Sequence, residues 1–304
     1  MTLARLVTEG RVRAGVDLSG LTTYRLGGPA AFLMDAATSD DLMAVAAVLA
    51  EETREVLVLG RGSNLVISEA GFEGLAIRLG PEFGGIELDA VPRVTVGGIV
   101  PLPQVARTAT AAGRRGLEFL IGVPGSAGGG VRQNAGCFGT EMVDVLESAV
   151  VFDLLTGKSA TVDAFALDMT YRHTSVTATD VVLSATFRAG EGDPVPGLEL
   201  IREHTRWRRL YQPGGTLNAG SVFKNPPGDS AGRIIDSLGL KGLRIGGAEV
   251  SGKHANFFVA MPGAEPSHVY LLVKKVVAIV ESETGIQLEP EIQFVGHFEN
   301  PEKR

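Results

Sequence analysis

The chain has 304 residues, of which 44% are hydrophobic and 21% charged, so it can bury a substantial core and we expect two or three domains. Its net charge of −7 disfavours nucleic-acid binding, and its single cysteine, Cys137, excludes an internal disulfide framework and a cysteine-based zinc site. We expect a cytoplasmic protein, because a single cysteine suits a reducing compartment, and no membrane partner, because no apolar run reaches the roughly 18–20 residues that span a bilayer.

The N-terminal part predicts a small α+β unit. Residues 39–53 predict a helix with Ser39 as its N-cap, because acidic residues follow at once and apolar residues recur at helical spacing. Apolar runs predict strands at residues 56–59, 75–79 and 94–96.

The middle of the chain predicts a second α+β unit. Residues 101–112 predict a helix, and strand-like runs follow at 149–153, 160–162 and 181–188. The sequence Gly-Glu-Gly-Asp-Pro-Val-Pro at residues 190–196 is typical of a linker.

The C-terminal part predicts a third unit. Residues 198–210 predict a helix with a basic face, and residues 266–283 predict a longer helix that ends at Gly285. A strand is expected at residues 292–295.

Two glycine-rich loops indicate a ligand site. Residues 122–139 contain seven glycines in eighteen residues, and residues 60–64 (Gly-Arg-Gly-Ser-Asn) follow an apolar run. Such loops let the backbone approach a phosphate closely, so together they favour a nest for a large anionic cofactor. A Rossmann site is disfavoured, because Leu65 stands at the third glycine position and only twelve residues separate Gly62 from the next strand.

Polar residues at three further places could carry chemistry. Ser221 and Lys224 share a loop bounded by glycine and proline, Tyr171 and Arg172 precede a strand, and Glu291 leads into the last strand. Each alone is typical of a turn residue, a surface ion pair or a chance acidic residue. The five histidines lack i, i+4 spacing, so no metal site is expected.

Nine motifs occur in an order that resembles the UDP-N-acetylenolpyruvoylglucosamine reductase (MurB) family of bacterial cell-wall synthesis. The resemblance covers about residues 20–296. The motifs are Tyr24-Arg-x-Gly-Gly28, Gly60-Arg-Gly-Ser-Asn64, Gly122-Val-Pro-Gly-Ser-Ala-Gly-Gly129, Asn134-Ala-Gly136, Tyr171-Arg172, Gly220-Ser-Val-Phe-Lys-Asn-Pro226, Gly242-Leu-Arg-Ile-Gly-Gly-Ala-Glu249, Lys253-His-Ala-Asn-Phe257 and Leu288-Glu-Pro-Glu291.

The resemblance implies an α+β fold: a two-subdomain FAD-binding module of the vanillyl-alcohol oxidase/PCMH type, then a separate α+β substrate-binding domain. The expected FAD-binding subdomains are residues 1–80 and 81–196, and the expected substrate domain is 197–304. The short third unit is similar to the type II branch of the family.

The implied enzyme is UDP-N-acetylmuramate dehydrogenase, an oxidoreductase acting on a CH–CH group with NADP as acceptor. It would hold FAD tightly without a covalent bond. NADPH would supply the hydride that reduces UDP-N-acetylglucosamine enolpyruvate to UDP-N-acetylmuramate. The implied cellular roles are peptidoglycan synthesis, cell wall biogenesis, cell shape, the cell cycle and cell division. A monomer is favoured, and the sequence leaves the oligomeric state open.

The resemblance also implies roles for single residues. The implied catalytic residues are Arg172, Ser221 and Glu291, with Ser221 as proton donor assisted by the positive charge of Lys224. The implied cofactor-binding residues are Gly60, Arg61, Gly62, Ser63, Asn64, Gly122, Pro124, Gly125, Ser126, Gly128, Gly129, Asn134, Ala135 and Gly136. The implied substrate-binding residues are Tyr171, Lys224, Asn225, Lys253, His254 and Asn256.

Some residues depart from the family pattern, and two alternatives remain open. Gln133, Cys137, Phe138 and Thr174 stand where Met, Ala, Tyr and Ser are common. One alternative is another FAD-dependent oxidoreductase of the same superfamily, for which Cys137 raises the possibility of a covalent flavin. The other is a non-catalytic nucleotide-binding relative. The residues that hold the uridine diphosphate stay open, with Arg206, Arg208 and Arg209 as candidates by charge alone.

Overall fold

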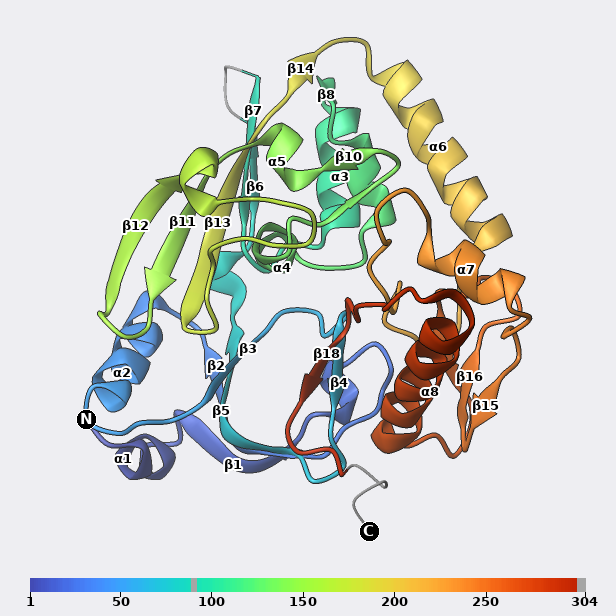
Figure 1. Cartoon of the computed structure of the whole chain (residues 1–304). Helices are drawn as coiled ribbons and strands as arrows, with labels where there is room; N and C mark the ends of the chain where they lie inside the picture. Colours follow the sequence, from blue (N-terminus) through green and yellow to red (C-terminus); the bar gives the residue numbers. More distant parts are fainter. Residues whose placement is uncertain (89–91, 300–304) are drawn as a thin grey trace. The chain divides into compact units, whose positions relative to one another are not determined.

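The computed structural model describes residues 1–88 and 92–299 and has the mixed α+β character expected from the sequence (Figure 1). The chain forms two compact units, each built from separated segments. Unit 1 comprises Met1–Ala14, Phe32–Arg61 and Gly74–Arg208. Unit 2 comprises Gly15–Ala31, Gly62–Glu73 and Arg209–Arg304. The expected subdomain boundaries at residues 80 and 196 remain a prediction. The grouping of N-terminal segments with the C-terminal residues was not predicted from the sequence.

The N-terminal elements alternate between helix and strand. They are α1 (Leu3–Thr8), β1 (Val12–Asp17), β2 (Pro29–Ala36), α2 (Ser39–Leu49), β3 (Val56–Leu59), β4 (Leu65–Ile67) and β5 (Phe72–Leu79). Four of the strands form a sheet in the order β1-β2-β5-β3. The predicted strands at 56–59 and 75–79 are therefore confirmed, the second with a longer N-terminal end.

The helix expected at residues 39–53 exists but is shorter, and its N-cap was wrongly placed at Ser39. The N-cap is Thr38, which has extended backbone angles. The Asp41 carboxylate accepts a hydrogen bond from the Thr38 backbone N–H at 3.1 Å, which satisfies a donor that the helix itself cannot pair. The helix ends at Leu49, four residues earlier than expected.

Strands β3 and β5 pair in parallel without a crossover helix. Their register runs from Val56 opposite Leu75 to Leu59 opposite Arg78. Residues 60–71, all of them described, contain no helix and include only the short strand β4, which pairs in parallel with β18 (Gln293–Val295) of unit 2. The expected absence of a Rossmann βαβ connection is confirmed.

The second sheet lies in unit 1 and is antiparallel throughout. Its strand order is β12-β11-β13-β7-β6, and Figure 1 shows β12, β11 and β13 side by side. The strands are β6 (Ile86–Leu88), β7 (Arg93–Gly97), β11 (Leu146–Asp153), β12 (Lys158–Asp163) and β13 (Asp180–Arg188). They confirm the strands expected at 94–96, 149–153, 160–162 and 181–188.

Short elements connect β7 to β11. Helix α3 confirms the helix expected at residues 101–112. The elements are α3 (Leu102–Ala111), β8 (Arg114–Arg115), α4 (Ala127–Arg132), β9 (Gly136–Cys137), β10 (Thr140–Glu141) and α5 (Met142–Val145).

The linker expected at residues 190–196 was wrong. Strand β14 (Gly190–Glu191) pairs with β8, and helix α6 (Pro194–Tyr211) begins inside this stretch. Proline suits the first turn of a helix, and the Asp193 carboxylate accepts a hydrogen bond from the Val195 N–H at 2.9 Å, as an N-cap residue does. A stretch whose composition is typical of a linker therefore contains the start of a helix.

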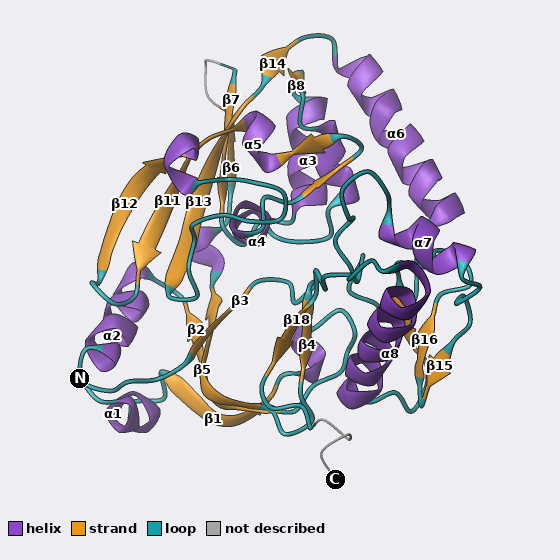
Figure 2. Cartoon of the chain, in the orientation of Figure 1, coloured by secondary structure: helices purple, strands orange, loops and turns teal. Residues whose placement is uncertain are grey.

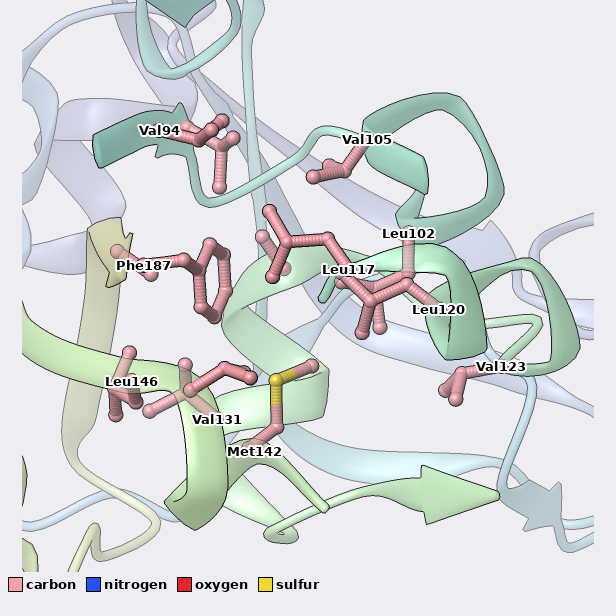
Figure 3. Packing of buried hydrophobic residues seen from close by; sticks show 14 of the residues in the cluster. Val94, Leu102, Val105, Leu117, Leu120, Val123, Val131, Met142, Leu146 and Phe187 are labelled. Carbon is pink, nitrogen blue, oxygen red and sulfur yellow. The ribbon is translucent and has the colours of Figure 1, made fainter. Parts of the chain in front are cut away.

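Two apolar cores stabilise unit 1. In the first, side chains from α3, α4 and the antiparallel sheet pack together, and Figure 3 shows Phe187 pointing from β13 into the cluster. In the second, α1 and α2 pack on the N-terminal sheet around Leu42, Val45 and Ile77. Burial of apolar side chains at such density is the main stabilising contribution to a fold of this kind.

Unit 2 has one core, formed around a long helix and a small sheet. Strands β15 (Arg244–Ile245), β16 (Ala248–Val250) and β17 (Phe258–Ala260) form the sheet, with α8 (Pro266–Thr284) beside β15 and β16 (Figure 2). Helix α7 (Ala231–Ser237) also contributes to this core. Helix α8 ends at Gly285, whose φ of 72° is left-handed, so the expected helix and its end are confirmed.

Helices α6 and α8 are the longest in the described part of the chain. Neither they nor any other helix described is long and apolar enough to cross a membrane.

We predict that Phe187→Ala lowers the free energy of unfolding by about 3–5 kcal/mol, because the fully buried ring would leave a cavity. Phe165→Ala is the matched control, since this ring is 99% exposed and its loss should change stability by less than about 0.5 kcal/mol. Urea unfolding of both variants measures the difference. Equal losses would contradict the packing described here.

Candidate active site

A cavity of about 210 Å³ lies within unit 1. Both glycine-rich loops contribute to its wall: Gly60 and Arg61 from one, and Ser126, Gly128 and Gly129 from the other. The sequence-based expectation that these two loops hold the same ligand therefore has a structural counterpart. The remaining lining residues are Val58, Arg78, Leu79, Leu59, Gly98, Ile99, Arg132, Val176, Asp180 and Val182.

Close backbone approach explains why glycines line this cavity. A Cβ at Gly60 would lie 2.8 Å from Ser126 Oγ, and one at Gly98 would lie 2.2 Å from the carbonyl oxygen of Val182. A Cβ at Gly128 would lie 3.0 Å from the same carbonyl oxygen. Larger residues would push these segments apart and change the shape of the cavity.

The cavity combines apolar side chains with fixed positive charges. Arg132 donates a hydrogen bond to the carbonyl of Thr177 at 2.7 Å, and burial lowers the pKa of its guanidinium while nearby Asp180 opposes this shift. Arg78 is paired with Asp35 at 2.6 Å. Such a site suits a ligand with a planar apolar part and phosphates.

Arg172 lies in unit 1 and contacts the second glycine-rich loop. Its guanidinium donates to the carbonyl oxygens of Asn134 at 3.4 Å and Gly136 at 3.2 Å, and to the Glu141 carboxylate at 2.9 Å. The ring of Tyr171 stacks on it, with the guanidinium carbon 4.8 Å from the ring centre. Arg172, Tyr171, Asn134 and Gly136 were expected at the site, whereas Glu141 was not.

Ser221 and Glu291 lie on adjacent segments of unit 2. The Glu291 backbone N–H donates to the carbonyl of Val222 at 2.7 Å. On the other side, the Asn64 side chain donates to the Glu291 carbonyl at 2.9 Å. The Glu291 backbone thereby lies between the loop of Ser221 and the first glycine-rich turn.

Asn256 fixes the loop that carries Ser221. Its side-chain oxygen accepts from the Phe223 N–H at 2.9 Å, and its amide nitrogen donates to the Phe223 carbonyl at 2.9 Å. Asn256 is only 3% exposed, so this position favours a role in holding the loop over direct contact with a ligand. Its predicted substrate contact remains a prediction.

The other expected substrate-binding residues of unit 2 make local contacts. Lys224 is paired with Glu289 at 2.6 Å, and Lys253 donates to the Arg209 carbonyl at 2.5 Å. Asn225 accepts a hydrogen bond from the first residue of α7, Ala231, at 3.1 Å.

His254 of unit 2 is half-buried beside α7. Its ring accepts from the Asn256 N–H at 3.2 Å, and burial followed by the charge of Lys241 lowers its pKa. A ring held neutral in this way can donate or accept a hydrogen bond but adds no charge to a site.

The sequence and structure match one family along nearly the whole chain. The family model described as the UDP-N-acetylenolpyruvoylglucosamine reductase C-terminal domain matches residues 212–295, and one described as an FAD binding domain matches residues 30–163. The UDP-N-acetylenolpyruvoylglucosamine reductase 2 of Symbiobacterium thermophilum is 40% identical over 95% of this chain and 93% of that relative. The chain belongs to the UDP-N-acetylenolpyruvoylglucosamine reductase family.

Further members agree with this assignment. The reductase of Syntrophotalea carbinolica is 38% identical over 95% of this chain and 96% of that protein. The crystal structure of UDP-N-acetylenolpyruvylglucosamine reductase (MurB) from Thermus caldophilus is 35% identical and has a TM-score of 0.82, covering 94% of this chain and 99% of that one. The expected order of an FAD-binding module and the family's C-terminal domain is thus confirmed.

The predicted cofactor residues of this reductase family member are divided between the two units. Gly62, Ser63 and Asn64 lie in unit 2, and the others lie in unit 1. The unit 1 residues that do not line the cavity are Gly122, Pro124, Gly125, Asn134, Ala135 and Gly136.

The residues of unit 1 fit part of an FAD molecule. The cavity is smaller than the roughly 300–1,000 Å³ of sites that enclose a drug-sized ligand, so it accommodates a portion of a dinucleotide. Its glycine wall allows backbone to approach phosphates, and its arginines carry the charge that phosphates need.

Cys137 is a partly buried thiol in this loop. Its Sγ donates to the Phe119 carbonyl at 2.9 Å, and burial raises its pKa to about 11 although Arg208 and Arg172 oppose the shift. Arg208 is itself held by the carbonyl of Ile121 at 3.3 Å and is not on a fully solvated helix face. A protonated, hydrogen-bonded thiol favours packing over a covalent flavin link.

We predict slow alkylation of Cys137 by iodoacetamide at pH 9 in the folded protein and fast alkylation in urea. With a pKa of about 11 against about 9 when unfolded, roughly 1% of the folded thiol is ionised at pH 9. The raised pKa stabilises the fold below pH 9, and this contribution is lost as the pH rises through about 11. Mass spectrometry follows the labelling, and equal rates in both states would contradict the burial.

Proposed function

We propose that this chain is an FAD-dependent reductase that uses NADPH to convert UDP-N-acetylglucosamine enolpyruvate to UDP-N-acetylmuramate in peptidoglycan precursor synthesis. The observation that carries the proposal is 40% identity, over nearly the full length of both chains, to a relative of that name. The glycine-walled cavity supports it independently, because it suits part of a dinucleotide.

The two glycine-rich loops hold FAD in this proposal. Gly60, Ser126, Gly128 and Gly129 approach the phosphates through their backbone, and Arg132 adds positive charge beside them. FAD bound there would supply hydride transfer from NADPH to the terminal carbon of the enolpyruvyl group.

Arg172 and Glu291 stabilise the charge that forms on the substrate. Hydride addition leaves negative charge on the adjacent carbon, delocalised into its carboxylate. Arg172 binds that carboxylate, and Glu291 in its protonated form donates a further hydrogen bond. Fixed donors of this kind lower barriers because they need no reorganisation during the reaction.

Ser221 delivers the proton that completes the reduction. Its hydroxyl protonates the carbon that carries the negative charge, and Lys224 three residues later stabilises the resulting alkoxide. Because Lys224 is paired with Glu289, its positive charge is partly offset, and its effect on Ser221 depends on how that pair is arranged.

The remaining polar residues bind the substrate in this proposal. These residues are Tyr171, Lys224, Asn225, Lys253 and His254. Asn256 takes part through the loop of Ser221. The reaction takes place in the cytoplasm and supports cell wall biogenesis, cell shape, the cell cycle and cell division.

We predict that NADPH bleaches the flavin absorbance of the purified holoprotein under anaerobic conditions and that UDP-N-acetylglucosamine enolpyruvate then restores it. The trace separates the two half-reactions, so each is tested alone. Bleaching without recovery would indicate another FAD-dependent oxidoreductase, and a protein that cannot be loaded with FAD would refute the proposal.

We predict that Ser221→Ala leaves flavin reduction by NADPH intact and slows reoxidation by substrate by about 10²–10⁴-fold, the usual effect of a proton donor. Stopped-flow absorbance measures both steps. Ser237→Ala is the control, because the Ser237 hydroxyl donates to the Ile234 carbonyl within α7. Normal reoxidation in Ser221→Ala would remove Ser221 from the mechanism.

A further inference from the structure

Arg172 occupies a strained position in a tight turn. Residues 170–173 form the turn, which is closed by two backbone hydrogen bonds between Thr170 and His173, at 3.0 and 3.1 Å. Arg172 has a φ of 55°, a left-handed conformation that is unfavourable for a residue with a side chain. Such strain persists only where surrounding contacts maintain it, and it is frequent at functional sites.

Glu141 supplies the charged contact to this arginine. One oxygen of its carboxylate accepts from Arg172 Nη1 at 2.9 Å, and the other accepts from Asn134 Nδ2 at 3.0 Å. The two side chains of the ion pair are 15% and 28% exposed for Arg172 and Glu141, so solvent screens their attraction less than on an open surface.

Asn134 completes a closed network. It is fully buried, and its amide nitrogen also donates to the Thr170 carbonyl at 2.8 Å, at the start of the strained turn. Its side-chain oxygen accepts from the Val143 N–H at 3.0 Å. With its donors and acceptor engaged, Asn134 presents one N–H to Glu141 in a fixed direction.

The backbone around Glu141 is also fixed. Glu141 lies opposite Gly136 in the β9–β10 hairpin, and its N–H donates to Asp144 at 2.8 Å. A Cβ at Gly136 would lie 2.7 Å from Glu141 Cγ, so glycine leaves the room that the Glu141 side chain occupies.

We infer that Glu141 is a positioning residue that holds the Arg172 guanidinium in the orientation in which it binds the substrate carboxylate. The inference rests on the proposed function, since Arg172 binds that carboxylate there. Glu141 acts through Arg172 and is not a catalytic residue itself. Its carboxylate accepts from Arg172 and Asn134 at once, which ties the guanidinium to the buried loop and to the turn.

Glu141→Ala removes the carboxylate that accepts from Arg172 at 2.9 Å and leaves the weaker carbonyl contacts to Asn134 and Gly136. Misplacement of a binding group by about 1 Å can slow a reaction by about 10²-fold. We therefore expect flavin reoxidation by the enolpyruvyl substrate to slow by about 10–10²-fold at saturating substrate. Flavin reduction by NADPH should be unchanged, a split that a general loss of structure would not produce.

Conservative variants test the chemistry of the contact. Glu141→Asp keeps a carboxylate and should recover part of the lost rate. Glu141→Gln should resemble Glu141→Ala, because the amide nitrogen of glutamine would face a donor of either Asn134 or Arg172. Glu147→Ala is the matched control: this residue pairs with Arg93 at 2.7 Å in the same unit and is 31% exposed, and both half-reactions should keep their rates.

The experiment uses anaerobic stopped-flow absorbance on the FAD-loaded full chain, for Glu141→Ala, Arg172→Ala and the double variant. If Glu141 acts through Arg172, its removal adds little once Arg172 is gone. An equal further slowing in the double variant would overturn the inference, as would loss of bound FAD in both Glu141→Ala and Glu141→Asp.

The same series separates this inference from the proposed function. Slow reoxidation in Arg172→Ala with normal reoxidation in Glu141→Ala would overturn the inference alone. Normal reoxidation in Arg172→Ala would overturn the role of Arg172, and the inference with it. Failure of the unmodified protein to pass either half-reaction would instead refute the proposed function.

Discussion

Unit 2 depends on the parallel pairing of β4 with β18, which joins a segment near the N-terminus to one near the C-terminus. The pairing is extended at both ends, where Gln293 donates to Asn64 and Ser68 donates to Val295, each at 2.9 Å. It fixes the segment that holds Glu291, and through the Glu291 contact to Val222 it also fixes the loop of Ser221. The positions of Glu291 and Ser221 thus depend on the pairing of β4 with β18, although neither residue lies in these strands.

Two cations with proposed roles are each held in an ion pair within their own unit. Arg172 contacts Glu141 in unit 1, and Lys224 contacts Glu289 in unit 2. A paired cation carries less net charge but keeps a fixed direction, and preorganised direction is what stabilises charge that appears during a reaction. In each unit, the direction of the cation is therefore set by its carboxylate partner.

Local patterns predicted most helices and strands, because periodicity and end signals lie within a few residues. Helix α8 and its end at Gly285 are examples, whereas the start of α6 was missed because Pro194 is compatible with both a linker and a first helical turn. The two glycine-rich loops were predicted from their composition to hold one ligand, and residues of both loops line one cavity. Glu141 could not be predicted, because its contact with Arg172 joins residues 31 apart and a lone glutamate carries no pattern.

The discontinuous build of unit 2 has a consequence during synthesis. The hydrogen bond from Asn64 to Glu291 joins residues 227 apart in the chain. At about 5–20 residues per second, the ribosome needs roughly 10–45 s to supply the partner of a segment that has already emerged. During that interval β4 is an unpaired strand edge, and its apolar Val66 and Ile67 have no core to enter. We therefore expect the yield of folded protein to depend on protection of this segment during synthesis as well as on the stability of the finished protein.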